Sequence, residues 1–300
     1  MNSAFWKAAW PRKQIILGPI VIALFMILNF PYAISTYHLE SGARLLEKAP
    51  VPSDVATQDA IVQHLQRALK WDDRNSQAYR LLGKAYTIQD QPARAAQALT
   101  TFVQSRPEHQ LGQLEWTKAC RTVKTALAGM IYADLLQVER SLVSEPSSPV
   151  PHPFQPSDYV RTTTLDLFSD NRPVPALFLH PVSAITYTLS LTQPAFLRFA
   201  MGNILRTPAS GSDGITFAVY ANDRRLFLEH LAPEMAQQGW QECEVDLSEF
   251  VGQTIALRLM TTPGSVGDVT ADWAVWSRPR VEAPEAKAYR QVLETCTLRQ

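Results

Sequence analysis

The chain has 300 residues and no net charge at pH 7, and 46% of its residues are apolar while 19% are charged. This length allows about two domains of ~150 residues, and the composition excludes a wholly disordered chain. Because positive and negative charges balance, the sequence gives no reason to expect a nucleic acid or another polyanion as partner.

The three cysteines, Cys120, Cys243 and Cys296, include no close pair. They therefore form neither a disulfide framework nor a zinc motif. Cys243 falls on the apolar phase of an expected strand and is interpreted as a buried apolar residue. The sequence leaves undecided whether Cys120 and Cys296 form a disulfide, since the spacing neither favours it nor rules it out.

The N-terminal segment has the pattern of a membrane anchor. No Asp, Glu, Lys or Arg occurs between Lys13 and Glu40, and residues 15–34 are almost wholly apolar. About 20 apolar residues span a hydrocarbon core of ~30 Å. Basic residues precede the segment and none follow it closely, so the positive-inside rule places the N-terminus in the cytoplasm and the rest outside. We expect residues 1–39 to be a cytoplasmic stub and one transmembrane helix; a cleaved signal peptide and a buried soluble helix are the alternatives.

Residues 40–143 are expected to form a helical domain, because apolar residues recur at three- and four-residue steps. The segment 76–109 resembles the tetratricopeptide repeat, a helix pair of about 34 residues. The residues that carry this resemblance are Tyr79, Leu82, Gly83, Tyr86, Ala95, Leu99 and Pro107. Gly83 and Ala95 are small where the two helices should cross. Only one repeat matches well, and residues 111–142 are interpreted as capping helices.

A short array of this kind implies a concave surface that docks a protein partner. The alternative is a spacer with no partner of its own. Beyond it, five of the twelve residues in the segment 145–156 are proline. Such a run forms neither a helix nor a central strand, so we expect residues 144–157 to be an extended linker between two domains.

Residues 158–282 are expected to form an antiparallel β-sandwich or jelly roll. Apolar and polar residues alternate with a period of two in segments such as 185–191 and 255–259, and turn-forming residues separate these segments. The stretches 213–219, 240–248 and 252–259 resemble the galactose-binding-like jelly-roll superfamily, which includes carbohydrate-binding modules of bacterial extracytoplasmic proteins. The fold class is therefore a multidomain α + β chain.

The resemblance implies a glycan site, for which aromatic and hydrogen-bonding side chains are needed. The candidates are Trp240, Trp276, Tyr220, Asn222, Arg258, Asp268 and Asp272. Relatives in the superfamily sometimes hold a structural calcium, for which Asp213 and Asp268 would supply carboxylates. No dense acidic loop accompanies them, so we expect no metal. Residues 283–300 are expected to form a helical tail that packs on the helical domain or on a partner.

The sequence contains no nucleophile elbow, phosphate loop, dinucleotide fingerprint or paired-histidine metal motif. We therefore expect a non-catalytic chain without a cofactor. The main hypothesis is a membrane-anchored, extracytoplasmic binding or scaffold protein of the bacterial cell surface, which docks a protein and binds a glycan. The alternative is an accessory subunit of a multisubunit membrane complex with no sugar binding, and a glycan-acting enzyme is the third hypothesis.

Overall fold

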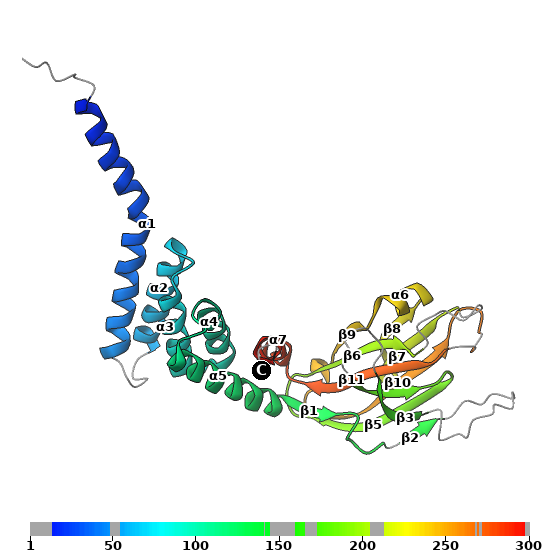
Figure 1. The fold of residues 1–300 in the computed structure, drawn as a ribbon. Coiled ribbons are helices and arrows are strands. Elements are labelled where there is room, and N and C mark those ends of the chain that lie inside the picture. Colours follow the sequence, from blue (N-terminus) through cyan, green and yellow to red (C-terminus); the bar gives the residue numbers. More distant parts are fainter. Residues whose placement is uncertain are drawn as a thin grey trace, which may run out of the picture. The chain divides into compact units, whose positions relative to one another are not determined.

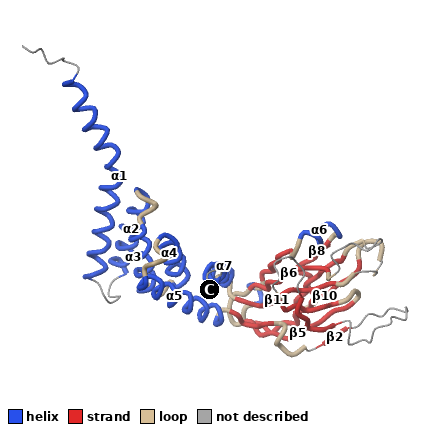
Figure 2. The backbone as a smooth tube through the Cα atoms, in the orientation of Figure 1, coloured by secondary structure: helices blue, strands red, loops and turns tan. Residues whose placement is uncertain are grey.

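The computed structural model describes residues 14–48, 55–140, 142–144, 160–165, 173–204, 213–267, 269 and 272–297. The described residues fall into two compact units, which divide after Ala126 and again after Lys287. Helices make up the first unit, and strands dominate the second (Figure 1, Figure 2). The second unit is thus inserted between two parts of the first along the chain. We call them the helical unit and the β unit.

The helical unit consists of helices from two parts of the chain. They are α1 (Gln14–Lys48), α2 (Val55–Trp71), α3 (Ser76–Ile88), α4 (Pro92–Ser105), α5 (Gln110–Gly129) and, from the end of the chain, α7 (Ala286–Thr297). Local chemistry sets the helix starts. The side chain of Asn75 accepts a hydrogen bond from the backbone N–H of Ala78 at 3.2 Å and caps α3, while Pro92 occupies the first turn of α4.

The predicted transmembrane helix is not supported. Within the part of the chain that the structure describes, no helix is both long enough and apolar enough to cross a membrane. This finding overturns the predicted single-pass anchor. The helix α1 continues without a break from Gln14 to Lys48 and so crosses the predicted boundary at residue 39. Leu39, Leu45 and Leu46 in its second half pack against an apolar cluster that includes Ile61 and Leu65 of α2.

The β unit is built from two antiparallel sheets. The first contains β3 (Val160–Leu165), β4 (Val174–Leu179), β11 (Ala274–Glu282), β6 (Phe196–Asn203) and β9 (Gln241–Asp246), in that order, with β1 (Ile131–Asp134) pairing with β11. The second contains β2 (Leu142–Ser144), β5 (Ser183–Leu191), β10 (Gln253–Pro263), β7 (Ile215–Ala221) and β8 (Arg224–Leu231), in that order. The helix α6 (Pro233–Gln238) and a short 3-10 helix at Ser248–Phe250 lie beside β9 in the chain.

One apolar core joins the two sheets of the β unit. Trp276 and Phe199 come from the first sheet, and Tyr187 and Phe217 come from the second; the exposed fraction of each is 2% or less. The ring centroids of Phe199 and Trp276 lie 4.7 Å apart, and those of Phe217 and Trp276 lie 5.1 Å apart. Side chains from two facing sheets therefore interdigitate, as the alternating sequence pattern predicts.

The structure moves two predicted boundaries and decides the position of the C-terminal helix. The predicted capping helices at 111–142 end earlier than expected, because residues 131–134 form strand β1 and residue 142 begins strand β2 (Leu142–Ser144). Ala133, Leu136 and Val138 pack on the sandwich core. The proline-rich stretch falls between β2 and β3 of the same unit, so it does not separate the domains; residues 145–159 themselves lie outside the described residues. The tail helix α7 belongs with the helical unit, which was one of its two predicted positions.

Candidate functional site

A groove of about 560 Å³ opens in the helical unit, between α1, α3, α4 and α5. Its lining is largely apolar and includes Ala43, Leu46, Leu81, Ile88, Ala95 and Leu99. Charged side chains line the same groove, namely Glu47, Lys84, Asp90, Glu115 and Lys118. An apolar hollow with a few polar groups is the usual chemistry of a binding site in a protein.

Glu115 on α5 is the most strongly held charge of the groove. Its carboxylate accepts hydrogen bonds from Nε of Arg80 at 2.7 Å and from Nη2 of Arg80 at 3.0 Å, and Nζ of Lys84 lies 3.5 Å away. Burial alone would raise the pKa of Glu115, but the hydrogen bond from Arg80 and the charge of Lys84 outweigh it and lower the pKa. Glu115 is thus an ionised carboxylate whose ion pair with Arg80 links α5 to α3. A carboxylate with a lowered pKa is unsuited to act as a general acid.

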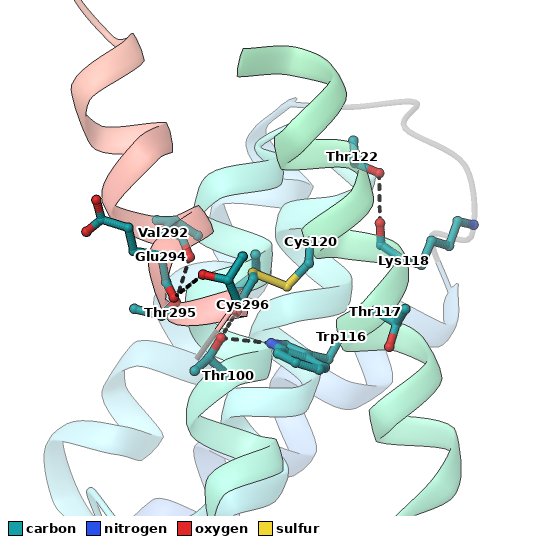
Figure 3. Close-up of a disulfide and its surroundings, with 12 residues drawn as sticks. Thr100, Trp116, Thr117, Lys118, Cys120, Thr122, Val292, Glu294, Thr295 and Cys296 are labelled. Atoms are coloured by element: carbon teal, nitrogen blue, oxygen red, sulfur yellow. Dashed lines mark hydrogen bonds between the residues drawn. A yellow bond between two sulfur atoms is a disulfide. The ribbon is translucent and has the colours of Figure 1, made fainter. Parts of the chain in front are cut away.

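Small residues let the groove helices approach one another. A Cβ placed on Gly83 of α3 would lie 2.5 Å from Cγ of Leu99 in α4. A Cβ on Gly112 of α5 would lie even closer to the ring of Phe102 in α4. The indole N–H of Trp116 donates to Oγ1 of Thr100 at 3.0 Å and joins α5 to α4 (Figure 3). These contacts fix the separation of the walls and therefore the width of the groove.

A disulfide joins Cys120 of α5 to Cys296 of α7, across a sequence separation of 176 residues (Figure 3). Both cysteines are buried, and Tyr289, Val292 and Leu293 of α7 pack on the apolar cluster around them. The bridge that the sequence left open is therefore present. It clamps the end of the chain onto the helical unit.

In the β unit, three candidate side chains gather where β7 turns into β8. Arg258 of β10 stands opposite Tyr220 of β7 in the strand register, and its guanidinium carbon lies 4.7 Å from the centre of the Tyr220 ring. Nη2 of Arg258 lies 3.6 Å from the carboxylate of Asp223, whose side chain is 92% exposed. Asn222 is at the same turn, but its side-chain oxygen accepts the backbone N–H of Ala256 at 2.9 Å. Asn222 therefore holds the turn in place.

The other predicted glycan residues do not join this group. Trp276 and Asp272 are both fully buried, so neither presents a side chain at the surface of the β unit. Trp240 is half-buried and packs in a cluster with Phe178 and Trp273. These tryptophans thus belong to apolar clusters of the sandwich and do not form an exposed aromatic surface.

Of the two calcium candidates, only Asp213 lies in the part of the chain that the structure describes. One carboxylate oxygen of Asp213 accepts the backbone N–H of Val266, and Gly264 packs against the same carboxylate. Asp268 lies outside the described residues. Among those that are described, no three His, Cys, Asp or Glu side chains are grouped so that they could hold a metal ion.

Sequence reasoning missed Arg80, Lys84 and Glu115, although one signal was available. Arg80 and Lys84 are four residues apart, so they share a face of α3 and repel one another unless an anion lies between them. That the anion is Glu115, on α5, required the fold. Of the predicted repeat residues, Leu82, Gly83, Tyr86 and Ala95 are buried between helices, Tyr79 is half-buried, and Pro107 lies exposed in the turn before α5.

No family model matches the chain. An uncharacterized protein of Archaeoglobus fulgidus is 33% identical over 120 residues, which cover 35% of this chain and 30% of the relative. The chain thus aligns with less than a third of that relative's length. Similar solved structures include the CBM51 module from Clostridium perfringens GH95 in complex with methyl-galactose, with 15% identity, a TM-score of 0.36 and coverage of 50% of this chain and 98% of the module.

A family 35 carbohydrate-binding module from an environmental isolate is 16% identical, with a TM-score of 0.30 and coverage of 50% of this chain and 91% of the module. Likenesses at this level of identity and TM-score carry no argument about what this chain binds. The functional proposals therefore rest on the geometry of the groove and of the Tyr220 turn.

Proposed function

We propose that this chain is a non-catalytic binding protein whose helical unit docks a segment of a partner protein in the groove between α1, α3, α4 and α5. The observation that carries the proposal is the groove itself, a hollow of about 560 Å³ with an apolar lining and a charged rim. The fixed state of Glu115, which Arg80 and Lys84 hold, supports a role in binding over a role in chemistry.

The chemistry of the groove favours an amphipathic partner helix. Leu46, Leu81 and Ile88 offer apolar contacts from two walls, which suit apolar side chains that recur at three- and four-residue steps. Lys118 and Lys84 are cations on the rim, whereas Glu47 and Asp90 are anions. A partner segment with charges of both signs beside its apolar stripe is therefore complementary to the groove.

A second candidate function is glycan binding by the β unit. It is favoured by the group at the β7–β8 turn, where Tyr220 offers an aromatic ring and Arg258 and Asp223 offer hydrogen-bonding groups of both charges. Stacking on an aromatic ring combined with a few polar contacts is a suitable arrangement for a sugar. A glycan array probed with the full chain tests this function. Tyr220→Ala should abolish any binding, while Tyr132→Ala, at an exposed tyrosine of β1, should retain it.

We also propose that the chain works outside the reducing cytoplasm. The support is the Cys120–Cys296 bridge, because disulfides persist in oxidising compartments and are rare in the cytosol. Both a scaffold protein and an accessory subunit of a larger complex fit this location. The scaffold protein would bind a sugar as well as a protein, whereas the accessory subunit would bind protein alone.

Partner capture with a blocked groove tests the docking proposal. Thr122 lines the groove and Thr117 does not, although both are exposed threonines on α5. Thr122→Trp places an indole in the groove, whereas Thr117→Trp adds the same bulk outside it. A partner cross-linked to the unmodified chain in native extracts should be lost at least about tenfold with Thr122→Trp, an energetic cost of about 1.4 kcal/mol. Retention of the partner by Thr122→Trp contradicts the proposal.

A further inference from the structure

Two histidines from different helices meet inside the helical unit. Nδ1 of His38 in α1 lies 3.2 Å from Nδ1 of His64 in α2, and the ring centroids are 5.4 Å apart. Both side chains are half-buried. The contact lies within the α1–α2 interface, because a Cβ on Gly42, one turn after His38, would lie 3.5 Å from Cβ of His64 and 2.9 Å from Leu65.

The short distance allows only some protonation states. A hydrogen bond between two Nδ1 atoms needs one ring to donate its N–H and the other ring to accept it. When both rings are protonated, both Nδ1 atoms carry hydrogen, and two cations face each other without an acceptor. The pair therefore stabilises the contact of α1 with α2 only while at least one ring is neutral.

The neighbouring positive charge also disfavours protonation of the pair. Arg67, one turn after His64 on α2, is a further cation that acts on His38. On α1, Tyr37 packs its ring against His38, and the carboxylate of Glu40 is held by Arg44 at 3.0 Å. Two residues after His64, the side chain of Gln66 in α2 donates a hydrogen bond of 3.1 Å to the hydroxyl of Tyr86 in α3. Both partners of this bond are uncharged.

We propose that the His38–His64 pair is a pH-sensitive latch between α1 and α2, which opens under mild acid. Desolvation, followed by the charges of His64 and Arg67, lowers the pKa of His38 from its ordinary value of 6.5. A histidine whose pKa is lower in the folded state stabilises the fold fully above pH 6.5, and this contribution is lost as the pH falls below that value. The neighbouring Arg67 and the lack of a third metal-ligating side chain among the described residues argue against a metal site here.

The latch has a consequence for the groove. Ala43, Leu46 and Glu47 of α1 form one wall of it, and they lie one to three turns after His38 in the same helix. Loosening α1 therefore widens the groove and weakens its grip on an occupant. This consequence rests on the proposed docking function, whereas the opening of α1 itself does not.

Hydrogen exchange of the free, full-length chain tests the latch without any partner. Protection of the amides at residues 36–48 is measured at pH 7.5 and at pH 5.0, each normalised to an unstructured peptide of the same sequence. Protection should fall severalfold at the lower pH, because protonation of His38 weakens the contact of α1 with α2 and local opening exposes these amides. The double variant His38→Gln and His64→Gln keeps two side chains that can hydrogen-bond but cannot titrate, so it should lose this fall, while His230→Gln in the β unit should keep it.

Equal protection of residues 36–48 at the two pH values overturns the proposal, and so does an undiminished fall in the double glutamine variant. A second measurement does not depend on the variants folding well. Ring proton signals of His38 followed by NMR should titrate below pH 6.5, because burial and the neighbouring charges lower the pKa of His38. A midpoint of His38 at or above pH 6.5 excludes the latch even if the groove binds a partner, so the latch and the docking function can fail separately.

Discussion

Gly83 of α3 lies directly against Leu99 of α4, so close that a Cβ on Gly83 would sit 2.5 Å from Cγ of Leu99. Both residues are buried, and Leu99 also lines the groove. The contact sets the distance between two of the groove helices. The predicted role of Gly83 as a small residue at a helix crossing is therefore seen directly in the structure.

Gly83→Ala should destabilise the helical unit. The added methyl group has no space, and overpacking of this kind costs typically about 1–3 kcal/mol, which exceeds the gain in helix propensity of roughly 1 kcal/mol. Urea unfolding followed by circular dichroism measures the change. The matched control is Gly129→Ala at the end of α5, where a Cβ meets nothing within 4 Å, and this variant should unfold at the same or a higher urea concentration.

How far the sequence predicts this fold depends on the range of the interactions. Gly83, Ala95 and Leu99 lie within one helix pair, and the alternation along Ser183–Leu191 lies within one strand, so local patterns were enough for both. The strands β1 and β2 are short, and the apolar residues between 131 and 142 also fit a helical spacing, so the sequence pattern predicted capping helices up to residue 142. Pairing with β11 and β5 decided otherwise.

The sequence did not predict which side chains pair over long distances along the chain. Arg80 and Glu115 are 35 residues apart, and His38 and His64 are 26 apart, so nothing local connects them. For the glycan candidates, the sequence could not separate buried from exposed tryptophans. Tryptophan suits a sandwich core as well as a sugar surface, and only the exposed fraction of Trp276, which is zero, distinguishes the two.

Removal of the disulfide should destabilise the chain strongly. Replacing Cys120 and Cys296 by serine frees the loop that the bridge closes, which costs typically about 2–5 kcal/mol. Thermal unfolding with and without reductant measures the effect, and only the chain with both cysteines should respond to reductant. Cys243→Ser is the control, since Cys243 is a free thiol whose pKa burial raises to about 12. A melting temperature that reductant leaves unchanged in the native chain contradicts the structural role of the bridge.

Arg198 holds a buried network at one end of the β unit. Its Nη1 donates to the fully buried carboxylate of Glu282 at 2.7 Å, and its Nε lies 3.3 Å from Glu244, which Lys287 also contacts at 3.2 Å. Arg198→Ala takes the guanidinium away from a buried carboxylate, which costs about 3–5 kcal/mol. Chemical unfolding should show this loss.

The matched control for Arg198 is Arg225→Ala on the exposed part of β8. An exposed arginine of this kind changes stability by less than about 0.5 kcal/mol. If both arginine variants unfold at the same urea concentration, the network around Glu282 does not stabilise the β unit.

Glu115 should make the helical unit sensitive to acid. Its pKa is lowered in the folded chain, so the carboxylate stabilises the fold above the ordinary pKa of 4.5, and this contribution disappears as the pH falls further. Unfolding free energies at pH 6 and pH 3 measure the loss. Glu115→Gln should show a smaller fall with acid than the native chain, while Glu108→Gln, at an exposed residue of the preceding turn, should behave as the native chain does.

Site-specific photocross-linking in living cells tests the central claim most directly. A photoreactive phenylalanine analogue at position 122 faces the groove, and the same residue at position 117 lies on α5 outside it. Docking in the groove predicts that position 122 gives a discrete protein cross-link with a yield at least about tenfold higher than position 117. The cross-linked peptide of the partner should be amphipathic. Equal yields from the two positions, or no cross-link from position 122, would contradict the account.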